Sequence, residues 1–128
     1  MKRLLLDTHA LIWWLNGDER LGQQARAEIG NSQNEVYVSA ASVWEMAIKK
    51  QLGKLDAPDD IEQRVELAGF SKLAISMFHA QEAGLLPNHH KDPFDRMLIA
   101  QAQITGLIIL TKDQHFPKYG VRLIDASR

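Results

Sequence analysis

The chain has 128 residues, a formal net charge of -1 and no cysteine. At about 150 residues per domain, this length predicts a single domain over residues 1–128 and excludes a second one of full size. Area scaling predicts that roughly two thirds of the surface is buried, enough for one core. The balanced charge excludes a broad electrostatic attraction to nucleic acid, so any such binding must be local. The missing cysteines exclude a disulfide framework and a thiol nucleophile.

Hydropathy indicates neither a membrane protein nor a secreted one. The first apolar run has only three leucines before Asp7, which is too short for a signal peptide. No run approaches the roughly 18 apolar residues of a membrane helix. With 45% hydrophobic and 24% charged residues, the composition is typical of a soluble globular protein. We therefore expect a cytoplasmic protein that makes no contact with a membrane.

The N-terminal part of the chain alternates predicted strands and helices. Arg3–Leu6 is a short apolar run that predicts a strand buried on both faces. Ala10–Leu15 predicts a short helix closed by a turn, and Gln23–Ile29 predicts a second helix. Val36–Val38 is β-branched and aromatic, which predicts the second strand. Apolar residues at helical spacing then predict a helix over Ser42–Leu52.

The rest of the chain continues the alternation. Asp59 and Glu62 have the spacing of a capping box, which favours a helix beginning near Pro58. Further elements are expected in chain order at Pro58–Ala68 (helix), Lys72–Ile75 (strand), Ser76–Ala83 (helix), Asp92–Ile104 (helix), Leu107–Leu110 (strand) and Val121–Ile124 (strand). The last strand is a candidate for a sheet edge. Strands that alternate with helices predict an α/β fold with a central parallel sheet of four to five strands flanked by helices.

Four acidic residues are expected at one edge of this sheet. Asp7 ends the first strand, and Asp113 follows the fourth. Glu45 lies in the first turns of the helix after the second strand, and Asp95 lies in the first turn of the helix that feeds the fourth strand. Ligands of parallel sheets bind outside the carboxyl ends of the strands. We therefore expect the four carboxylates to meet there.

Most of these acids also have a structural explanation. Asp92, which precedes a proline, is typical of a helix N-cap, so capping stands ahead of catalysis for this residue. Asp95 suits a helix N-terminus, and Glu45 has capping-box spacing from Ser42. Asp113 fits a polar turn. The coincidence of four acids at one sheet edge outweighs these separate explanations.

Asp7 is different because it follows a buried strand and has no obvious partner in the sequence. Two carboxylates about 4 Å apart repel by about 4 kcal/mol at an effective dielectric constant near 20, so a cluster needs a compensating cation. Mg²⁺ or Mn²⁺ takes carboxylate oxygens and keeps several waters, which leaves room for a phosphate and an attacking water. The strand-end hydroxyls of Thr8 and Ser39 are candidates to orient a carboxylate or, alternatively, to cap helices.

Basic residues accompany the acids in the sequence. The candidate phosphate contacts are Lys49, Lys50, Lys91, Arg96 and Lys112. For any single lysine a solvated surface position is the alternative, and Lys49 also has the spacing for an exposed pair with Glu45. The five histidines show no zinc-binding spacing. The chain also lacks the motifs of P-loop enzymes, dinucleotide-binding folds and serine hydrolases.

Four segments carry these residues in an order that is typical of a known family. They are Leu4–Trp13, Ser39–Lys49, Asp92–Ala102 and Leu110–Asp113. Together they resemble the PIN-domain nucleases of the VapC-like toxin type, and the resemblance covers essentially the whole chain. It implies a Mg²⁺- or Mn²⁺-dependent endoribonuclease with metal-binding acids at Asp7, Glu45, Asp95 and Asp113. Asp92 matches a shared motif position and is expected to support the site or to cap the helix.

The resemblance also implies a substrate and partners. It implies hydrolysis of phosphodiester bonds in structured RNA, transfer RNA included, and silencing by a small antitoxin protein. Because Ala10–Leu15 is apolar on all sides of its helix, Trp13 and Trp14 face either a partner or the chain's own core. One small domain leaves little room for specificity, so we expect control through a homodimer and a partner protein.

Two other functions fit the same residues. An aspartate at a strand end is also the nucleophile of phosphatases and phosphotransferases. In those enzymes a second acid usually follows two positions later, where this chain has His9. In a third reading the acids are only helix caps and surface pairs of a non-catalytic binding domain. Metal binding by the acids would exclude that third possibility.

Overall fold

In the computed structural model, which describes residues 1–128, five strands form one sheet. The strands are β1 (Arg3–Leu6), β2 (Glu35–Ser39), β3 (Ser71–Leu73), β4 (Ile108–Thr111) and β5 (Leu123–Asp125). Their order across the sheet is β3-β2-β1-β4-β5, and every pairing is parallel. The predicted α/β fold is confirmed, with five strands and with β5 at an edge.

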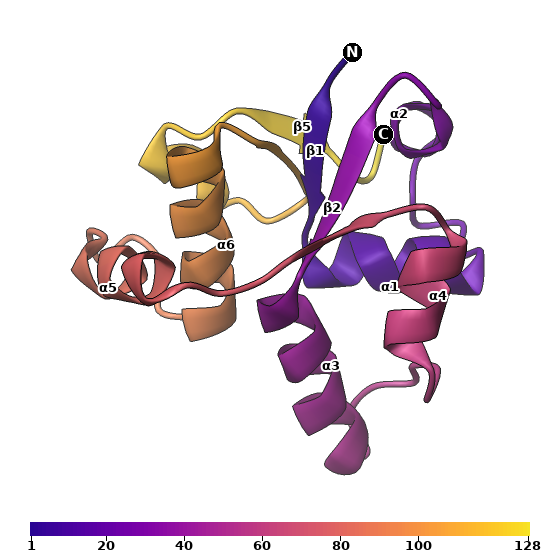
Figure 1. Cartoon of the computed structure of the whole chain (residues 1–128), viewed down its shortest axis with the longest axis horizontal. Coiled ribbons are helices and arrows are strands. Elements are labelled where there is room, and N and C mark those ends of the chain that lie inside the picture. The colour runs from indigo at the N-terminus through magenta and orange to yellow at the C-terminus, as the bar shows by residue number, and fades with distance from the viewer.

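Six helices cover the two faces of the sheet. They are α1 (Thr8–Asn16), α2 (Gln23–Gly30), α3 (Ala40–Gln51), α4 (Ile61–Leu67), α5 (Met77–Leu85) and α6 (Pro93–Thr105), and a short 3₁₀ turn, η1, spans Phe116–Tyr119. Figure 1 shows α5 and α6 on one side of β1 and β2, and α1, α2 and α4 on the other. None of the helices has both the length and the apolar character needed to cross a membrane.

The alternation of side chains along β1 divides the core into two layers. Leu4 and Leu6 belong to the cluster formed with α1, α2 and α4, whereas Leu5 belongs to the cluster formed with α6. All three leucines are fully buried, and burying one such side chain stabilises the fold by about 1.5–3 kcal/mol. The prediction of a strand buried on both faces is confirmed.

Polar residues at helix starts determine where the helix N-termini lie. Asp7 caps α1 by accepting a hydrogen bond from the Ala10 N–H, and Ser39 caps α3 in the same way. Asp92 caps α6, which ends at Gly106 in the left-handed conformation (φ 70°). In Figure 1, α1 and α3 begin at the lower ends of β1 and β2, where α6 also begins. Three helix N-termini therefore gather at the carboxyl edge of the sheet.

Helix α4 differs from the prediction at its start. It begins at Ile61 after the N-cap residue Asp60, which makes no side-chain capping bond. The capping box expected from Asp59 and Glu62 is wrong, because the Asp59 carboxylate instead pairs with the Lys50 ammonium at 2.5 Å. An ion pair with a residue nine positions earlier takes the place of the local cap.

The tryptophans of α1 are core residues. Trp13 is 2% exposed and belongs to the larger core cluster. Trp14 is partly buried, with its ring 6.0 Å from that of Phe70. Of the two alternatives left open for Trp13 and Trp14, a partner surface or the chain's own core, their burial supports the core. The exposed tryptophan is Trp44 of α3, at 61%.

Candidate metal centre

The structure brings the four predicted acids together at the carboxyl edge of the sheet. Asp7 lies between β1 and α1, Glu45 lies on α3, Asp95 lies in the first turn of α6, and Asp113 follows β4. Their proximity is evident in the electrostatics of Asp95. Burial raises the pKa of this carboxyl to about 8, with further contributions from the charges of Asp92, Asp7, Glu45 and Asp113.

Asp7 is buried but has protein partners. One of its carboxylate oxygens accepts a 2.8 Å hydrogen bond from the Ala10 N–H. Burial raises the pKa of Asp7, and hydrogen bonds with the Thr111 side chain and the Ala10 backbone act in the opposite direction. Asp7 therefore has hydrogen-bond partners that its sequence context did not indicate, and it caps α1 while its charge remains costly. Asn, which caps helices equally well, is a suitable replacement for testing that charge.

Both carboxylate oxygens of Glu45 are engaged. Oε1 accepts a 2.6 Å hydrogen bond from the Thr8 hydroxyl, and Oε2 pairs with the Lys49 ammonium at 2.6 Å. The capping box expected between Ser42 and Glu45 is wrong, because α3 begins at Ala40 and Ser42 is buried inside it. The expected surface pair with Lys49 forms, but Glu45 itself is only 3% exposed. The hydrogen bond between Glu45 and Lys49 raises the pKa of the Lys49 ammonium.

The three residues expected to support the site have different positions. Thr8 orients Glu45 directly, as described above. Asp92 accepts hydrogen bonds from the backbone N–H groups of Phe94 and Asp95, which agrees with the expected capping role. Ser39 caps α3 and donates a 2.6 Å hydrogen bond to Gln101, so it contacts none of the four acids. The buried amide of Gln101 is a partner that the sequence did not indicate.

Two histidines that the sequence did not single out contact the acids. His90 Nε2 lies 2.8 Å from a carboxylate oxygen of Asp95 and 3.2 Å from one of Asp113. The other Asp113 oxygen accepts a hydrogen bond from the His115 N–H and lies 2.9 Å from His115 Nδ1. Burial opposes ionisation of Asp113, but these contacts outweigh it and lower the pKa of the carboxyl. The His115 contact, two residues from Asp113, is local, whereas the His90 contact depends on the fold.

Arg96 has a structural position. Its guanidinium donates hydrogen bonds of 2.8–3.1 Å to backbone carbonyls near the start of α6. These acceptors are the carbonyl oxygens of Ala83, Leu86, Pro87 and His90. The terminal nitrogens of Arg96 thus hold the loop between α5 and α6, which favours a structural role over the predicted phosphate contact.

The remaining basic candidates differ in whether a carboxylate of the chain pairs with them. Lys50 donates to the Ala57 carbonyl and pairs with Asp59. Lys112 lies over the Trp13 ring, with its nitrogen 5.2 Å from the ring centroid. Lys91 is exposed on the loop just before Asp92. Lys91 and Lys112 are thus the cations near the acids that no carboxylate of this chain neutralises.

The residues present fit a hard divalent cation. The donor set consists of carboxylate oxygens, which Mg²⁺ and Mn²⁺ prefer. Burial disfavours the charged forms of Asp7 and Asp95, as their raised pKa values indicate. A bound cation would offset that cost.

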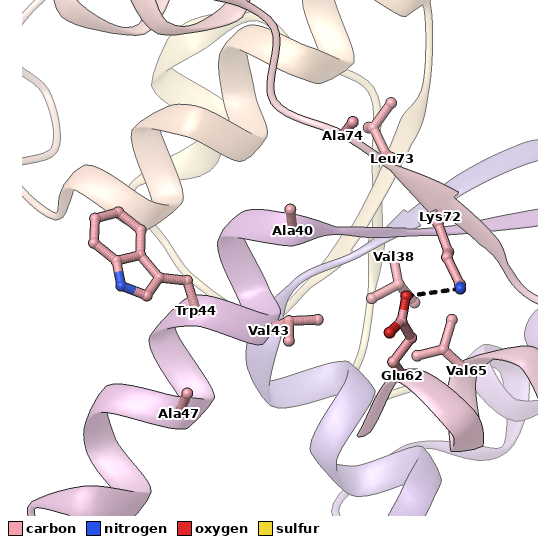
Figure 2. A pocket seen from close by; sticks show the side chains of 10 residues that line it. All are labelled: Val38, Ala40, Val43, Trp44, Ala47, Glu62, Val65, Lys72, Leu73 and Ala74. Carbon is pink, nitrogen blue, oxygen red and sulfur yellow. Dashed lines mark hydrogen bonds and ion pairs between the residues drawn. The ribbon is translucent and has the colours of Figure 1, made fainter. Parts of the chain in front are cut away.

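A separate apolar groove lies between α3, α4 and β3, with a volume of about 480 Å³. Figure 2 shows an ion pair between Lys72 and Glu62 beside it, with a nitrogen–oxygen distance of 2.8 Å. Its lining consists of Val38, Ala40, Val43, Trp44, Ala47, Glu62, Val65, Lys72, Leu73 and Ala74. None of the four acids of the metal centre lines this groove.

The fold and the acids at its carboxyl edge define an α/β domain with a buried cluster of acids that could hold a metal ion. Residues 4–122 match the PIN domain family, and the chain belongs to that family. This confirms the PIN-domain resemblance carried by the four sequence segments.

Individual relatives agree with this assignment. Over 60 residues the chain is 35% identical to Ribonuclease VapC16 of Mycobacterium tuberculosis, a match that covers 44% of this chain and 43% of that protein. The matched segment thus spans less than half the length of that relative. The fold is similar to the DNA-bound VapBC structure from Salmonella typhimurium (TM-score 0.71, 20% identity, 98% of each chain). It is also similar to a toxin-antitoxin complex from Klebsiella pneumoniae (TM-score 0.65, 23% identity, 96% of this chain and 97% of that one).

Proposed function

We propose that this chain is a Mg²⁺- or Mn²⁺-dependent endoribonuclease that hydrolyses phosphodiester bonds in structured RNA, transfer RNA included. The observation that carries the proposal is the convergence of Asp7, Glu45, Asp95 and Asp113 at one sheet edge, where burial, followed by the charges of the neighbouring acids, raises the pKa of Asp95 to about 8. The partial match to a relative named as a ribonuclease supports the substrate class. The cytoplasm is the proposed location.

The protein contributes to the reaction by positioning carboxylates for the ion and lysines for the RNA. The four carboxylates would hold the ion, which when bound supplies Lewis-acid activation of water and neutralises charge on the phosphate. Thr8 and Lys49 hold the two oxygens of Glu45 in a fixed orientation. Lys91 and Lys112 are positioned to attract the RNA backbone, and that attraction falls with added salt.

Cleavage of a transfer RNA and of an unstructured oligonucleotide, each with Mg²⁺, with Mn²⁺ and with EDTA, tests the activity. Cleavage is expected with metal and not with EDTA, and Asp95→Asn is expected to abolish it. Asp56→Asn is the matched control, because Asp56 is an exposed acid that the four-acid centre does not include. Undiminished cleavage by Asp95→Asn, or cleavage in EDTA, would overturn the proposed site.

We further propose that the chain is the toxin of a toxin–antitoxin pair and acts as a homodimer. The fold is similar to chains solved in toxin–antitoxin complexes. The groove beside the unpaired edge of β3, with Trp44 61% exposed, is the proposed surface for a segment of the antitoxin. It replaces the surface expected around Trp13 and Trp14.

Co-purification with the product of an adjacent small reading frame tests the pair. Trp44→Lys is expected to abolish that co-purification and to leave RNA cleavage intact. Retained co-purification would exclude the groove as the partner's surface. Light scattering of the purified chain measures the dimer, and a mass of one chain would exclude it.

A further inference from the structure

We propose that Gln101 is a positioning residue of the four-acid centre, which holds the helix of Asp95 in register with the helix of Glu45. The inference rests on the proposed function, because it concerns how two of the four carboxylates are placed. Gln101 lies on α6 and is fully buried among apolar residues of that helix. Burial of an amide costs free energy unless its hydrogen bonds are made, so its partners are informative.

The two ends of the Gln101 amide bind different elements. Its Oε1 accepts a 2.6 Å hydrogen bond from the Ser39 hydroxyl, at the start of α3. Its Nε2 donates at 3.3 Å to the Ala74 carbonyl, on the segment that joins β3 to α5. Because a carbonyl can only accept, the amide nitrogen faces Ala74 and the amide oxygen faces Ser39. The amide thus joins three segments that are distant in the sequence.

His79 supports the nitrogen end of this amide. Its Nδ1 accepts a 3.1 Å hydrogen bond from the Ser76 backbone N–H, within the capping box that begins α5. The same nitrogen lies 3.3 Å from Gln101 Nε2. Since Nδ1 already accepts from one N–H group, it is an acceptor for the amide as well. No buried side-chain polar atom lacks a partner, and a fully satisfied buried network specifies one arrangement of its members.

The link between Ser39 and Gln101 is equally far from the two carboxylates along their helices. Glu45 follows Ser39 by six residues, and Asp95 precedes Gln101 by six. At 1.5 Å per residue, each carboxylate lies about 9 Å along its helix from the link. Helices α3 and α6 pack against each other. A shift of one helix along the other would therefore change the separation of Glu45 and Asp95.

Metal affinity depends on that separation. Mg²⁺ demands near-ideal octahedral geometry, and a site of this kind needs its ligands held to within about 0.5 Å. Neither Glu45 nor Asp95 is bonded directly to the other's helix by a recorded hydrogen bond, whereas Ser39 and Gln101 are bonded across the two helices. The geometry points to this buried bond as the contact that sets the register.

The alternative is that Gln101 only stabilises the core. The two roles predict different results, because a loss of stability alone leaves the Mg²⁺ affinity of the folded protein unchanged. A loss of register weakens Mg²⁺ binding even at temperatures where the variant is fully folded.

Calorimetric titration of Mg²⁺ into the full chain distinguishes these roles. Gln101→Met keeps the length of the side chain and removes its amide, and it is expected to weaken Mg²⁺ binding about tenfold. Gln103→Met is the matched control on the same helix, since Gln103 is exposed and donates at 3.3 Å to the Tyr119 carbonyl instead. It is expected to bind Mg²⁺ unchanged. Equal affinity in Gln101→Met and the unaltered chain would overturn the positioning role.

Ser39→Gly tests the same link from the other helix and keeps the proposal testable if Gln101→Met does not fold. It removes the hydroxyl, while glycine caps a helix almost as well as serine. Mg²⁺ binding is expected to weaken about tenfold. Ser39→Thr, which restores the hydroxyl, is expected to recover the affinity. A threonine variant as weak as the glycine variant would overturn the link.

The double variant Ser39→Gly/Gln101→Met tests whether the two residues act as one unit. Both substitutions remove the same hydrogen bond, so the double variant is expected to bind Mg²⁺ about as tightly as either single variant. Losses that multiply would show that the two side chains act independently, contrary to the proposal.

Failure of this proposal is distinguishable from failure of the proposed function. Unchanged Mg²⁺ affinity in every variant, with binding by the unaltered chain, overturns only the role of Gln101 and leaves the ribonuclease standing. Absence of Mg²⁺ binding by the unaltered chain would overturn the four-acid centre and this role with it.

Discussion

The Thr8 hydroxyl donates a 2.6 Å hydrogen bond to the carboxylate of Glu45, joining residues 37 positions apart at the carboxyl edge of the sheet. Both side chains are buried, so the bond is shielded from water and holds the carboxylate in one orientation. The residue that follows the Asp7 helix cap thereby positions an acid on α3. The orientation of Glu45, a proposed metal ligand, therefore depends on Thr8, which is next to Asp7, another proposed ligand.

Thr8→Val keeps the shape of this side chain and removes the donor. It is expected to destabilise the fold by about 1–3 kcal/mol, because a buried acceptor loses its partner. Loss of the orienting bond is also expected to weaken Mg²⁺ binding about 10–100-fold. Chemical denaturation and calorimetric titration measure the two effects. Thr8→Ser, which restores the hydroxyl, should recover both, and a serine variant as weak as the valine one would contradict this role.

The stability of the metal-free protein is expected to fall as the pH rises towards 8. In the fold Asp95 has a pKa of about 8 against an ordinary value of 3.8, so the native state holds this proton more tightly than the unfolded state. The stability this provides is complete below about pH 3.8 and is lost as the pH rises to about 8. Melting temperatures in EDTA at pH 6 and pH 8.5 measure the loss.

Asp95→Asn provides the control for this pH dependence, because it has no proton to lose. The fall in melting temperature between pH 6 and pH 8.5 should be clearly smaller in that variant. Added Mg²⁺ should raise the melting temperature of the unaltered chain most at pH 8.5, where the carboxylate is charged. An equal fall in both proteins would show that another group is responsible.

Arg96 is expected to contribute to stability, whereas Lys112 is expected to contribute to RNA binding. Arg96→Met removes donors from four backbone carbonyls and is expected to lower the free energy of unfolding by about 2–4 kcal/mol. Lys112→Met removes an exposed charge and is expected to change stability by less than about 0.5 kcal/mol. Only the lysine variant should reduce the salt dependence of RNA binding. The reverse pattern would restore Arg96 as the phosphate contact.

Substitutions of the buried Trp13 and the exposed Trp44 are expected to have different effects on stability. Trp13→Ala is expected to cost about 3–5 kcal/mol of stability, because it empties a site that is 2% exposed. Trp44→Ala removes a mostly exposed side chain, so a loss below about 1 kcal/mol is expected. Urea denaturation measures both free energies. Similar values for the two variants would contradict the burial that distinguishes them.

Much of this architecture follows from local signals. The polar residues Asp7, Ser39 and Asp92 stop apolar runs or precede a proline, and each caps a helix in the structure. Because parallel strands share one carboxyl edge, these local starts were sufficient to predict that the acids meet. Asp59 shows the limit, since its ion pair with Lys50 replaced the expected cap.

The features that the sequence did not indicate depend on contacts between distant residues. His90 reaches the acids because its backbone is held by the Tyr119 hydroxyl, 29 residues further along the chain. Arg96 is occupied by carbonyls of a loop whose path no local pattern predicts. For Trp13, an evenly apolar helix gives no sign of whether the chain or a partner covers it.

Calorimetric titration with Mg²⁺ is the sharpest test of whether the four acids form a metal centre. Mg²⁺ is the right probe because it prefers oxygen ligands and so does not compete for the histidine nitrogens. The unaltered chain and Asp56→Asn are expected to bind Mg²⁺ equally, and Asp7→Asn, which preserves the α1 cap, is expected to bind at least tenfold more weakly. Equal Mg²⁺ affinity in Asp7→Asn would show that the acids at this edge of the sheet do not form a metal centre.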